Sequence, residues 1–355
     1  LRGLQEQGLL FSSDDYIDAD KAMALPRQAV VKALCLHVSH DCNLRCKYCF
    51  ASTGDFGQGR KIMPPEIAKK AIDFVIARSG VRHNIEVDFF GGEPLMAWDT
   101  VTQTVDYARS LEEKHNKKFR FTITTNGLLL DEDKRKYINE NMDNCVLSLD
   151  GRREVNDEFR KTVAGTGSYD TIVPKFKALV DERDPNLDYY ARGTFTSHNL
   201  DFPEDVLSIA DAGFDRLSVE PVTADPGCGY DLTEDDLPKI EAEYDRLTDI
   251  MLERKKEGKP FTFFHFMVDL DQGPCVVKRL RGCGAGYEYV AVTPDGDIYP
   301  CHQFVGKDEF KQGSVLDQSF NMDIAQKFAG MNIYSRPKCQ KCWAKFYCSG
   351  GCSTT

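Results

Sequence analysis

The sequence lacks any long apolar run. No stretch of about 18 or more apolar residues occurs in its 355 residues, so we expect no membrane-spanning helix. Basic residues are also in the minority, since 45 Lys and Arg stand against 56 Asp and Glu. The net charge of −11 argues against a nucleic-acid partner, which favours a basic face. No signal peptide follows Leu1, and we expect a cytoplasmic protein with no membrane partner.

Cysteine, by contrast, is abundant, with 13 residues. Cytosolic thiols stay reduced, so dense cysteine indicates metal binding or catalysis and not disulfides. Cys35, Cys145 and Cys228 stand alone, and we interpret them as small buried apolar residues. The other cysteines gather at short spacings near the two ends of the chain, which predicts two metal-binding regions.

Strand and helix patterns alternate between about residues 29 and 222. The strand candidates are AVVKALCLHVS, IEVDFF, FRFTITT, CVLSLD, YYARGTFT and RLSVEPV. The helix candidates begin at Pro64–Pro65 and continue at 100–114, 131–139, 169–182, 202–212 and, beyond the strands, 232–256. This order predicts an α/β fold, a partial (β/α)6 TIM-like barrel with its site at the C-terminal strand ends. A closed barrel needs eight units, so an open side would admit a substrate as large as a peptide.

The composition divides the chain into three expected parts. Residues 1–28 read as a short helix, a turn and an acidic linker, residues 29–269 as the barrel with its following helix, and residues 270–355 as a cysteine-rich domain. Between the last two, FTFFHFM (261–267) predicts a packed strand, with His265 as a core or interface histidine.

The first cysteine motif is SHDCNLRCKYCF, which places Cys42, Cys46 and Cys49 just after the first strand. Three thiolates on one tight loop can hold three irons of a 4Fe–4S cluster. The fourth iron is then open to a small chelating molecule. The alternative is a zinc site, for which His40 could be the fourth ligand.

This C-x3-C-x2-C motif, with Tyr48 before the last cysteine, resembles the signature of radical S-adenosylmethionine (SAM) enzymes. The resemblance extends over residues 29–222 and implies that the cluster cleaves SAM. It also implies that polar groups at the strand ends bind SAM. Besides Tyr48, those groups are Gly91, Gly92, Glu93 and Pro94 in GGEP, Thr124 and Asn126 in TTNG, Ser148 and Asp150 in SLDG, and Arg192. In the family GGEP binds the ammonium group, and a basic group such as Arg192 binds the carboxylate. Glu220 is a weaker candidate, and Arg192 is otherwise read as an edge-strand charge.

The second motif lies near the C-terminus. Cys283-x12-Gly296-x4-Cys301 precedes Cys339-x2-Cys342-x5-Cys348-x3-Cys352. This pattern resembles the SPASM domain of radical enzymes that modify peptides and proteins. The resemblance implies two auxiliary 4Fe–4S clusters, so three clusters in all. One would take Cys283, Cys301 and Cys352, and the other Cys339, Cys342, Cys348 and a later cysteine.

Several features of this motif leave alternatives open. The sequence ends at Thr355 without the later cysteine, and we expect that the C-terminus is incomplete. Cys275 is either a fourth ligand of the first auxiliary cluster or does not bind it, in which case one iron is open to a substrate thiolate. His302 either hydrogen-bonds a cluster sulfide or faces solvent. The alternative for the whole region is a pair of zinc ribbons.

Four stretches resemble maturases of SCIFF peptides, which are small and rich in cysteine. They are KALCLHVSHDCNLRCKYCFAS, GTGSYDTIVPKF, RGTFT and GCGAGYEYVAVTPDGDIYPCHQFVG. The resemblance implies a thioether bond between a cysteine sulfur and a backbone carbon, made through a 5′-deoxyadenosyl radical. It implies as partners a precursor peptide with a leader and an electron donor such as flavodoxin or ferredoxin. No general base is evident.

Three other functions are alternatives. An anaerobic sulfatase maturase or another SPASM peptide-modifying enzyme would share both cysteine motifs. A zinc-binding adaptor would use the cysteines without SAM. An electron carrier like ferredoxin is disfavoured by GGEP and by the barrel pattern.

Overall fold

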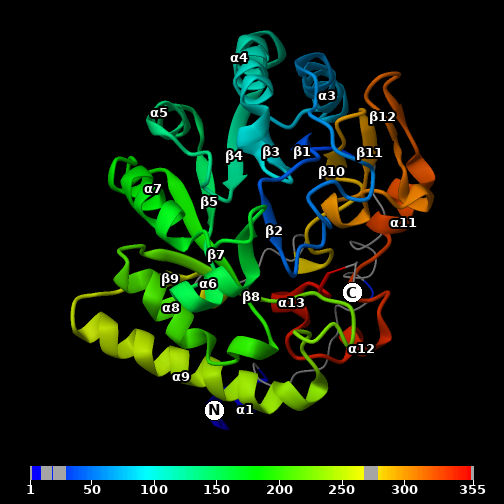
Figure 1. Cartoon of the computed structure of the whole chain (residues 1–355). Coiled ribbons are helices and arrows are strands. Elements are labelled where there is room, and N and C mark those ends of the chain that lie inside the picture. The colour runs from blue at the N-terminus through cyan, green and yellow to red at the C-terminus, as the bar shows by residue number, and fades with distance from the viewer. Residues whose placement is uncertain (1, 9–17, 19–28, 268–278, 353–355) are drawn as a thin grey trace.

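The computed structural model describes residues 2–8, 18, 29–267 and 279–352 of the chain. Within them, the framework is an 11-stranded sheet of order β13-β12-β11-β10-β1-β3-β4-β5-β7-β8-β9 (Figure 1). None of the described helices is both long enough and apolar enough to cross a membrane.

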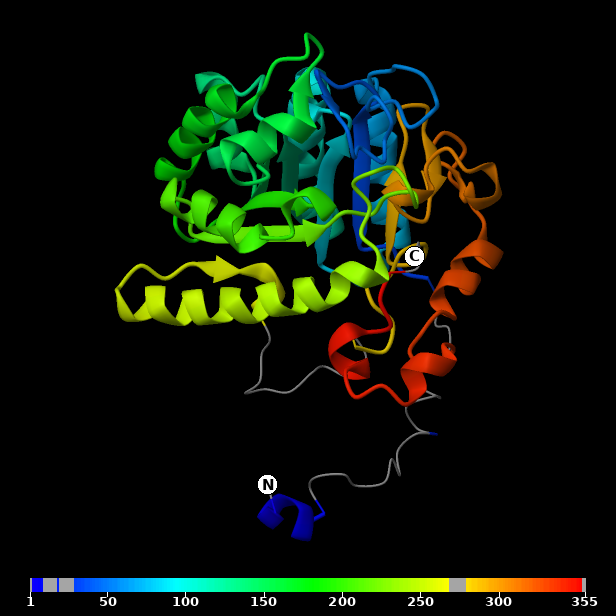
Figure 2. The same ribbon diagram turned by 60° about the horizontal axis from the view of Figure 1, so that its bottom comes forward.

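The centre of the sheet consists of parallel strands joined by helices. The strands are β1 (Ala33–Ser39), β3 (Asn84–Gly91), β4 (Lys118–Thr125), β5 (Asn144–Ser148), β7 (Asp188–Phe195) and β8 (Arg216–Pro221). The helices after them are α3 (Pro65–Arg78), α4 (Trp98–His115), α5 (Glu132–Asn141), α7 (Tyr169–Asp181), α8 (Phe202–Asp211) and α9 (Leu237–Lys256). The helices α3, α4, α5, α7 and α8 line the outside of the curved sheet (Figure 1), and α9 runs along one side of the barrel (Figure 2). The strand order does not close on itself, so the predicted partial barrel is confirmed.

The C-terminal region continues the barrel sheet. Strand β10 (Tyr289–Val292) pairs in parallel with β1, and Ala33 aligns with Tyr289. Beyond it β11 (Asp297–Tyr299), β12 (Gly313–Ser314) and β13 (Ser319–Phe320) follow antiparallel, while β9 (Thr262–Phe263) extends the other edge beside β8. The described short helices at the two ends of the chain are α1 (Arg2–Glu6), α11 (Met322–Ala329), α12 (Pro337–Gln340) and α13 (Lys345–Cys348).

Alternation along the strands decides which side chains face the helices and which face the inside of the barrel. In β1, Leu34, Leu36 and Val38 are buried in the main core with the helices. Cys35 belongs instead to a second core that includes Cys301. This second core joins the inner face of the barrel to the C-terminal region.

Two sequence predictions are wrong. Cys35 and Cys145 are buried as predicted, but Cys228 lies exposed in the turn-rich segment after β8. In FTFFHFM only Thr262–Phe263 form a strand, and Phe264–Phe266 form a 3-10 turn. Because β9 is the edge strand of the described sheet, it has a neighbouring strand on one side only. His265 is exposed, and so are Phe264, Phe266 and Met267 (50, 38 and 59% exposed).

Candidate functional site

The first three clustered cysteines lie on a loop that begins directly after β1. Within it Leu44–Cys46 form the short strand β2, which pairs antiparallel with β6 (Arg160–Thr162). Strand β6 follows helix α6 (Arg153–Phe159), and the pairing aligns Cys46 with Arg160. The loop is therefore held by a segment far along the chain, which the sequence pattern did not predict.

Nitrogen donors face the sulfur of Cys42. The backbone nitrogen of Leu44 lies 3.4 Å from this sulfur and the side-chain amide of Asn126 lies 3.6 Å from it. Cys42, Cys46 and Cys49 are all free and partly exposed. Hydrogen bonds to sulfur and soft thiolate ligands are features of iron–sulfur sites. This donor set fits a 4Fe–4S cluster, which the three cysteines would hold.

Burial changes the pKa values of two of these thiols, Cys42 and Cys46. It raises the pKa of Cys42 to about 12 and that of Cys46 to about 11. A guanidinium acts in the opposite direction, because Arg160 lowers the pKa of Cys46. Metal ligation requires thiolates, so binding of a metal here would release protons.

The zinc alternative requires a different arrangement. A structural zinc ion gathers four ligands at roughly 2.0–2.3 Å. In the described part of the chain, no group of three or more His, Cys, Asp or Glu side chains is arranged to hold one metal ion, and this holds for Cys42, Cys46 and Cys49 as well. His40 is instead buried, and its Nε2 lies 3.2 Å from Nδ1 of His37. His40 is therefore in contact with His37, and its role as a fourth zinc ligand stays a prediction.

The glycines of GGEP lie against the cysteine loop. A Cβ atom on Gly91 would stand 2.2 Å from the carbonyl oxygen of Ser39, and one on Gly92 would stand 2.2 Å from that of Asp41. The backbone nitrogen of Gly92 donates to Ser39 at 2.7 Å. Contact between the end of β3 and the backbone of Ser39 and Asp41 thus requires glycine here, and the predicted approach of a ligand stays a prediction.

Glu93 has a buried carboxylate that ties the end of β3 to the end of β4. Its oxygens accept hydrogen bonds from the Leu95 nitrogen at 3.0 Å, the Thr125 hydroxyl at 2.8 Å and the Asn126 nitrogen at 2.8 Å. Burial raises the pKa of Glu93 to about 7. A carboxylate has about four acceptor sites, so these three donors leave one, and the predicted contact with an ammonium group stays a prediction. Pro94 follows as the first residue of a 3-10 turn, Pro94–Ala97.

Asn126 connects β4 with the cysteine loop. Its side-chain nitrogen donates to Asn43 at 2.8 Å as well as facing the Cys42 sulfur, and its oxygen accepts from Leu128 at 3.1 Å. Thr124 is half-buried on the opposite face of β4 from Thr125. Asn126 therefore lies beside the expected cluster site.

Asp150 is fully buried just beyond the end of β5 and gathers groups from three segments. One of its oxygens accepts from the hydroxyl of Tyr48. The other lies 3.1 Å from the Thr194 nitrogen and 3.0 Å from Nε of Arg160. Burial raises the pKa of Tyr48 well above its usual value, so the phenol stays protonated and donates. The predicted residues Tyr48 and Asp150 are thus direct partners.

Arg192 is paired with Glu220. Its Nε lies 2.9 Å from a carboxylate oxygen of Glu220, which also accepts from Ser218 at 3.2 Å. Arg192 aligns with Ser148 across β5 and β7, so both side chains are on the inner face of the barrel. The structure therefore brings Arg192, Glu220 and Ser148 together, and Arg192 is not an isolated edge charge.

The second set of cysteines begins on the sheet. Cys301 is buried next to β11, and Cys283 and Cys352 lie within electrostatic range of its sulfur. Burial raises the pKa of Cys301 to about 11. Cys283 and Cys352 thus lie near enough to affect the Cys301 thiol, and the auxiliary cluster that the three would share stays a prediction.

The last cysteines lie on short helices. Cys339 is in α12, Cys348 ends α13, and the backbone nitrogen of Cys342 donates to Cys339 at 3.1 Å. All three are free thiols in one short segment, which suits a shared cluster. Cys275, the open question at the first auxiliary cluster, lies outside the described residues.

His302 lies between the two cysteine regions. Its ring centroid is 5.5 Å from that of Phe50, which follows the cysteine loop, and 5.1 Å from that of Phe90 on β3. Burial lowers the pKa of His302 to about 4, so the ring is neutral at pH 7. Of the two sequence expectations, exposure to solvent is wrong, because the ring is packed against aromatic neighbours.

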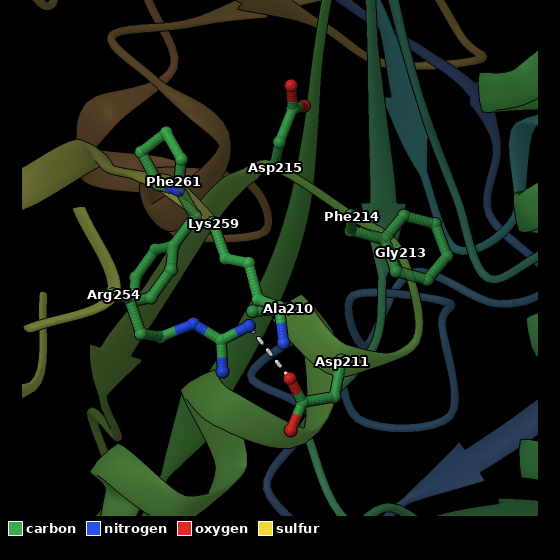
Figure 3. A pocket seen from close by; sticks show the side chains of 9 residues that line it. Ala210, Asp211, Gly213, Phe214, Asp215, Arg254, Lys259 and Phe261 are labelled. Carbon is green, nitrogen blue, oxygen red and sulfur yellow. Dashed lines mark ion pairs between the residues drawn. The ribbon is translucent and has the colours of Figure 1, made fainter. Parts of the chain in front are cut away.

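A separate cavity of about 380 Å³ lies at the opposite end of the barrel strands. It is lined by Gly213–Asp215, which lead into β8, and by Lys259–Phe261, which lead into β9 (Figure 3). Arg254 points into it and pairs with Asp211 at 2.8 Å. The N-terminal strand ends thus form this cavity, whereas the loop of Cys42, Cys46 and Cys49 follows the C-terminal end of β1. It is not part of the candidate site.

Sequence reasoning missed Arg160 and Asn43. Both lie in segments without strand or helix periodicity, and their roles depend on contacts with Cys46 and Asn126 that only the fold creates. The GTGSY stretch downstream of Arg160 carries a family resemblance but no strand pattern, so it did not predict β6.

Comparisons with known proteins agree with this geometry. Residues 36–195 match the radical SAM superfamily, and residues 283–343 match the SPASM iron–sulfur cluster-binding domain. A cysteine-type anaerobic sulfatase-maturating enzyme of Clostridium novyi is 25% identical over 336 residues, which cover 88% of this chain and 85% of that protein. The radical SAM cyclopropyl synthase TigE of Paramaledivibacter caminithermalis is 24% identical over 344 residues, which cover 91% of this chain and 68% of TigE.

The fold also matches solved structures. The structure of anSMEcpe with bound AdoMet and Cp18Cys peptide superposes with a TM-score of 0.71, and it covers 91% of this chain and 89% of that one. At 22% sequence identity, this likeness concerns the fold. The partial barrel and its C-terminal extension are thus a known pairing.

Proposed function

We propose that this radical SAM enzyme, which carries a SPASM domain behind its barrel, joins a cysteine sulfur to a backbone carbon of a small peptide. The peptide would be ribosomally made, rich in cysteine and preceded by a leader. The observation that carries the proposal is the arrangement of Cys42, Cys46 and Cys49 beside Asn126. Here soft ligands and nitrogen donors meet at the C-terminal strand ends.

Some of the described residues would bind the cluster, and others would fix the positions of the strand ends around it. Cys42, Cys46 and Cys49 would hold the cluster, and SAM would bind at the strand ends that contact their loop. When bound, these groups would supply the electron and the 5′-deoxyadenosyl radical that removes a hydrogen from the peptide. Glu93 and Asp150 keep β3, β4, β5 and the loop in one arrangement through buried hydrogen bonds and through the ion pair of Asp150 with Arg160.

The inner face of the barrel supports a peptide substrate. Tyr190, Arg192 and Thr194 alternate with residues that face the helices, so they line the inside. At the edge Tyr190 contacts Phe264, with ring centroids 5.5 Å apart, and Met267 at 3.7 Å from its hydroxyl. Exposed apolar side chains beside the Arg192–Glu220 pair offer both apolar and polar contacts. Such a rim suits a peptide that enters from the open side.

The SPASM domain supports action on a peptide or protein. We propose one auxiliary 4Fe–4S cluster at Cys283, Cys301 and Cys352 and another at Cys339, Cys342 and Cys348. We further propose a flavodoxin or ferredoxin as electron donor, and the domain limits 1–28, 29–269 and 270–355.

The test is anaerobic reconstitution followed by iron counting and assay of 5′-deoxyadenosine, with and without a cysteine-rich peptide. We expect roughly four irons for each bound cluster and release of deoxyadenosine by the reduced enzyme. A peptide that loses two hydrogens and one alkylatable thiol would support the thioether. No deoxyadenosine from an iron-loaded, reduced enzyme would refute the proposal.

A second candidate is an anaerobic sulfatase maturase, and the similarity to the Clostridium novyi enzyme favours it. The two candidates share the cysteine sites and SAM cleavage, so they differ in the peptide product. Modification of a sulfatase-derived peptide, with no cross-link in any cysteine-rich peptide, would favour this second candidate.

A further inference from the structure

We propose that Arg160 positions the cysteine loop and is its buried counter-charge, so that the cluster expected at Cys42, Cys46 and Cys49 is easier to reduce. The inference rests on the proposed function, because it takes that cluster as present. It concerns a residue outside the cysteine motif and outside every strand-end motif.

The backbone fixes the place of Arg160. In the antiparallel pair of β2 and β6, Arg160 is directly opposite Cys46. Residues opposite each other in such a pair have Cβ atoms about 4.5–5.5 Å apart and side chains on the same face. The pairing of β2 with β6 therefore places the charged side chain of Arg160 next to Cys46, an expected cluster ligand.

The side chain is then held by two partners. Its Nε lies 3.0 Å from Oδ1 of Asp150, and its guanidinium carbon lies 5.6 Å from the ring centroid of Tyr48. Tyr48 donates to the other oxygen of Asp150. Tyr48 is on the cysteine loop itself, so this triangle of Tyr48, Asp150 and Arg160 ties the loop to the end of β5.

Burial of the Arg160–Asp150 ion pair costs desolvation free energy and strengthens its electrostatic effect on neighbouring groups. The side chain of Arg160 is 11% exposed and that of Asp150 is 0% exposed. A buried ion pair is weak support for stability, because removing two charges from water costs much of what their attraction returns. In a low-dielectric interior, however, a charge acts strongly on its neighbours. This combination favours an electrostatic role over a merely stabilising one.

The sign of the effect follows from charge. Reduction adds one electron to the cluster, and a nearby cation stabilises the reduced form and raises the midpoint potential. Asp150 carries the opposite charge and works against Arg160. The loop has a second cation, Arg45, which donates to the carbonyls of Cys42 and Leu44, both at 2.6 Å. Arg160 differs because its side chain is nearly buried and faces Cys46.

The experiment compares Arg160→Gln with Arg153→Gln in enzyme reconstituted anaerobically and checked for iron. Arg153 is an exposed arginine at the start of α6 and pairs with Asp170, so it is the matched control. The readout is the midpoint potential of the SAM-binding cluster, from a redox titration followed by electron paramagnetic resonance. We expect Arg160→Gln to lower the ratio of reduced to oxidised cluster about tenfold at a fixed potential, which equals about 59 mV for one electron. Arg153→Gln should leave the ratio unchanged.

Asp150→Asn separates charge from structure. It keeps an acceptor for Tyr48 but removes a negative charge, so we expect the potential to rise. A purely structural role would shift both variants in the same direction. Opposite shifts support the inference, and equal potentials in the wild type and an iron-loaded Arg160→Gln enzyme overturn it.

If Arg160→Gln lost its iron, measurements on two other variants, Arg160→Lys and Asp150→Asn, would still test the inference. Arg160→Lys keeps the charge and should keep both iron and a potential near that of the wild type. A potential in Asp150→Asn that falls or stays constant overturns the inference independently. If the wild type itself bound no cluster at these cysteines, the proposed function would fail, which is a different result from any of these.

Discussion

The carboxylate of Glu93 accepts a hydrogen bond from the backbone nitrogen of Asn126 at 2.8 Å, and the side chain of Asn126 faces the sulfur of Cys42. The end of β3 is thus connected to the end of β4 and, through it, to the cysteine loop. Glu93 holds these three parts in one arrangement.

Replacing Glu93 with alanine should destabilise the fold. The change leaves buried donors of Leu95, Thr125 and Asn126 without their acceptor, and each such group costs about 1–3 kcal/mol. We expect the free energy of unfolding to fall by about 3 kcal/mol or more, as measured by urea denaturation. The control is Glu86→Ala, an exposed position on the same strand, for which a loss of similar size would contradict the account.

Glu93 also predicts a pH dependence. Burial raises its pKa in the folded state from 4.5 to about 7, so folding favours the protonated carboxyl. The stability that this provides is fully present below pH 4.5 and is lost as the pH rises through about 7. We expect Glu93→Gln, which does not titrate, to lack this fall, which amounts to about 3 kcal/mol. Parallel curves of unfolding free energy against pH for the two proteins would contradict it.

The two cysteine regions should respond differently to substitution. Cys46→Ala should abolish release of 5′-deoxyadenosine, because it removes a ligand of the expected SAM-binding cluster. Cys301→Ala should keep SAM cleavage but lose the cross-linked peptide. The exposed Cys228→Ala is the control and should retain iron, deoxyadenosine and product. Unchanged deoxyadenosine from Cys46→Ala would show that the cluster is elsewhere.

The rim of the barrel should contribute to peptide binding. Phe264 is 50% exposed beside Tyr190, so truncation removes apolar surface that a bound peptide would cover. We expect Phe264→Ala to weaken peptide binding about fivefold, or about 1 kcal/mol, in a fluorescence anisotropy titration. SAM cleavage without peptide should not change. Val81→Ala removes an exposed apolar side chain in the turn before β3 and should bind normally.

Gly92 should tolerate no side chain. An added Cβ would stand 2.2 Å from the backbone oxygen of Asp41, which cannot move without displacing the cysteine loop. We expect Gly92→Ala to lose about 1–3 kcal/mol of stability together with iron at the first cluster, measured by denaturation and by iron content. Gly3→Ala has open space around it and serves as control. Full iron loading of Gly92→Ala would contradict this contact.

The barrel could be predicted from the sequence because its signals are local. Most of the central strands are short runs rich in β-branched and aromatic residues followed by a helical period, as in β3 and α4. Strands β2 and β6 have three residues each and come from distant segments of the chain, so no local hydrophobic periodicity predicts them. The pairing of β10 with β1 is of the same kind.

The site was predicted where spacing alone carries the chemistry. Cys42, Cys46 and Cys49 lie within one loop, so their spacing can be recognised in the sequence without knowing the fold. The partners of Glu93 and Asp150 come from other strands, so their actual roles could not be predicted. The exposure of Phe264–Met267 was missed for the same reason, because composition cannot tell an edge strand from a central one.

The most direct measurement is a single anaerobic reaction in which 5′-deoxyadenosine and peptide mass are quantified together. The account predicts that deoxyadenosine forms in proportion to a peptide that has lost two hydrogens and has one thiol resistant to alkylation. Deoxyadenosine with an unmodified peptide, across cysteine-rich peptides that the enzyme binds, would contradict the thioether function. The absence of deoxyadenosine from the reduced, iron-loaded enzyme would contradict the radical centre at Cys42, Cys46 and Cys49.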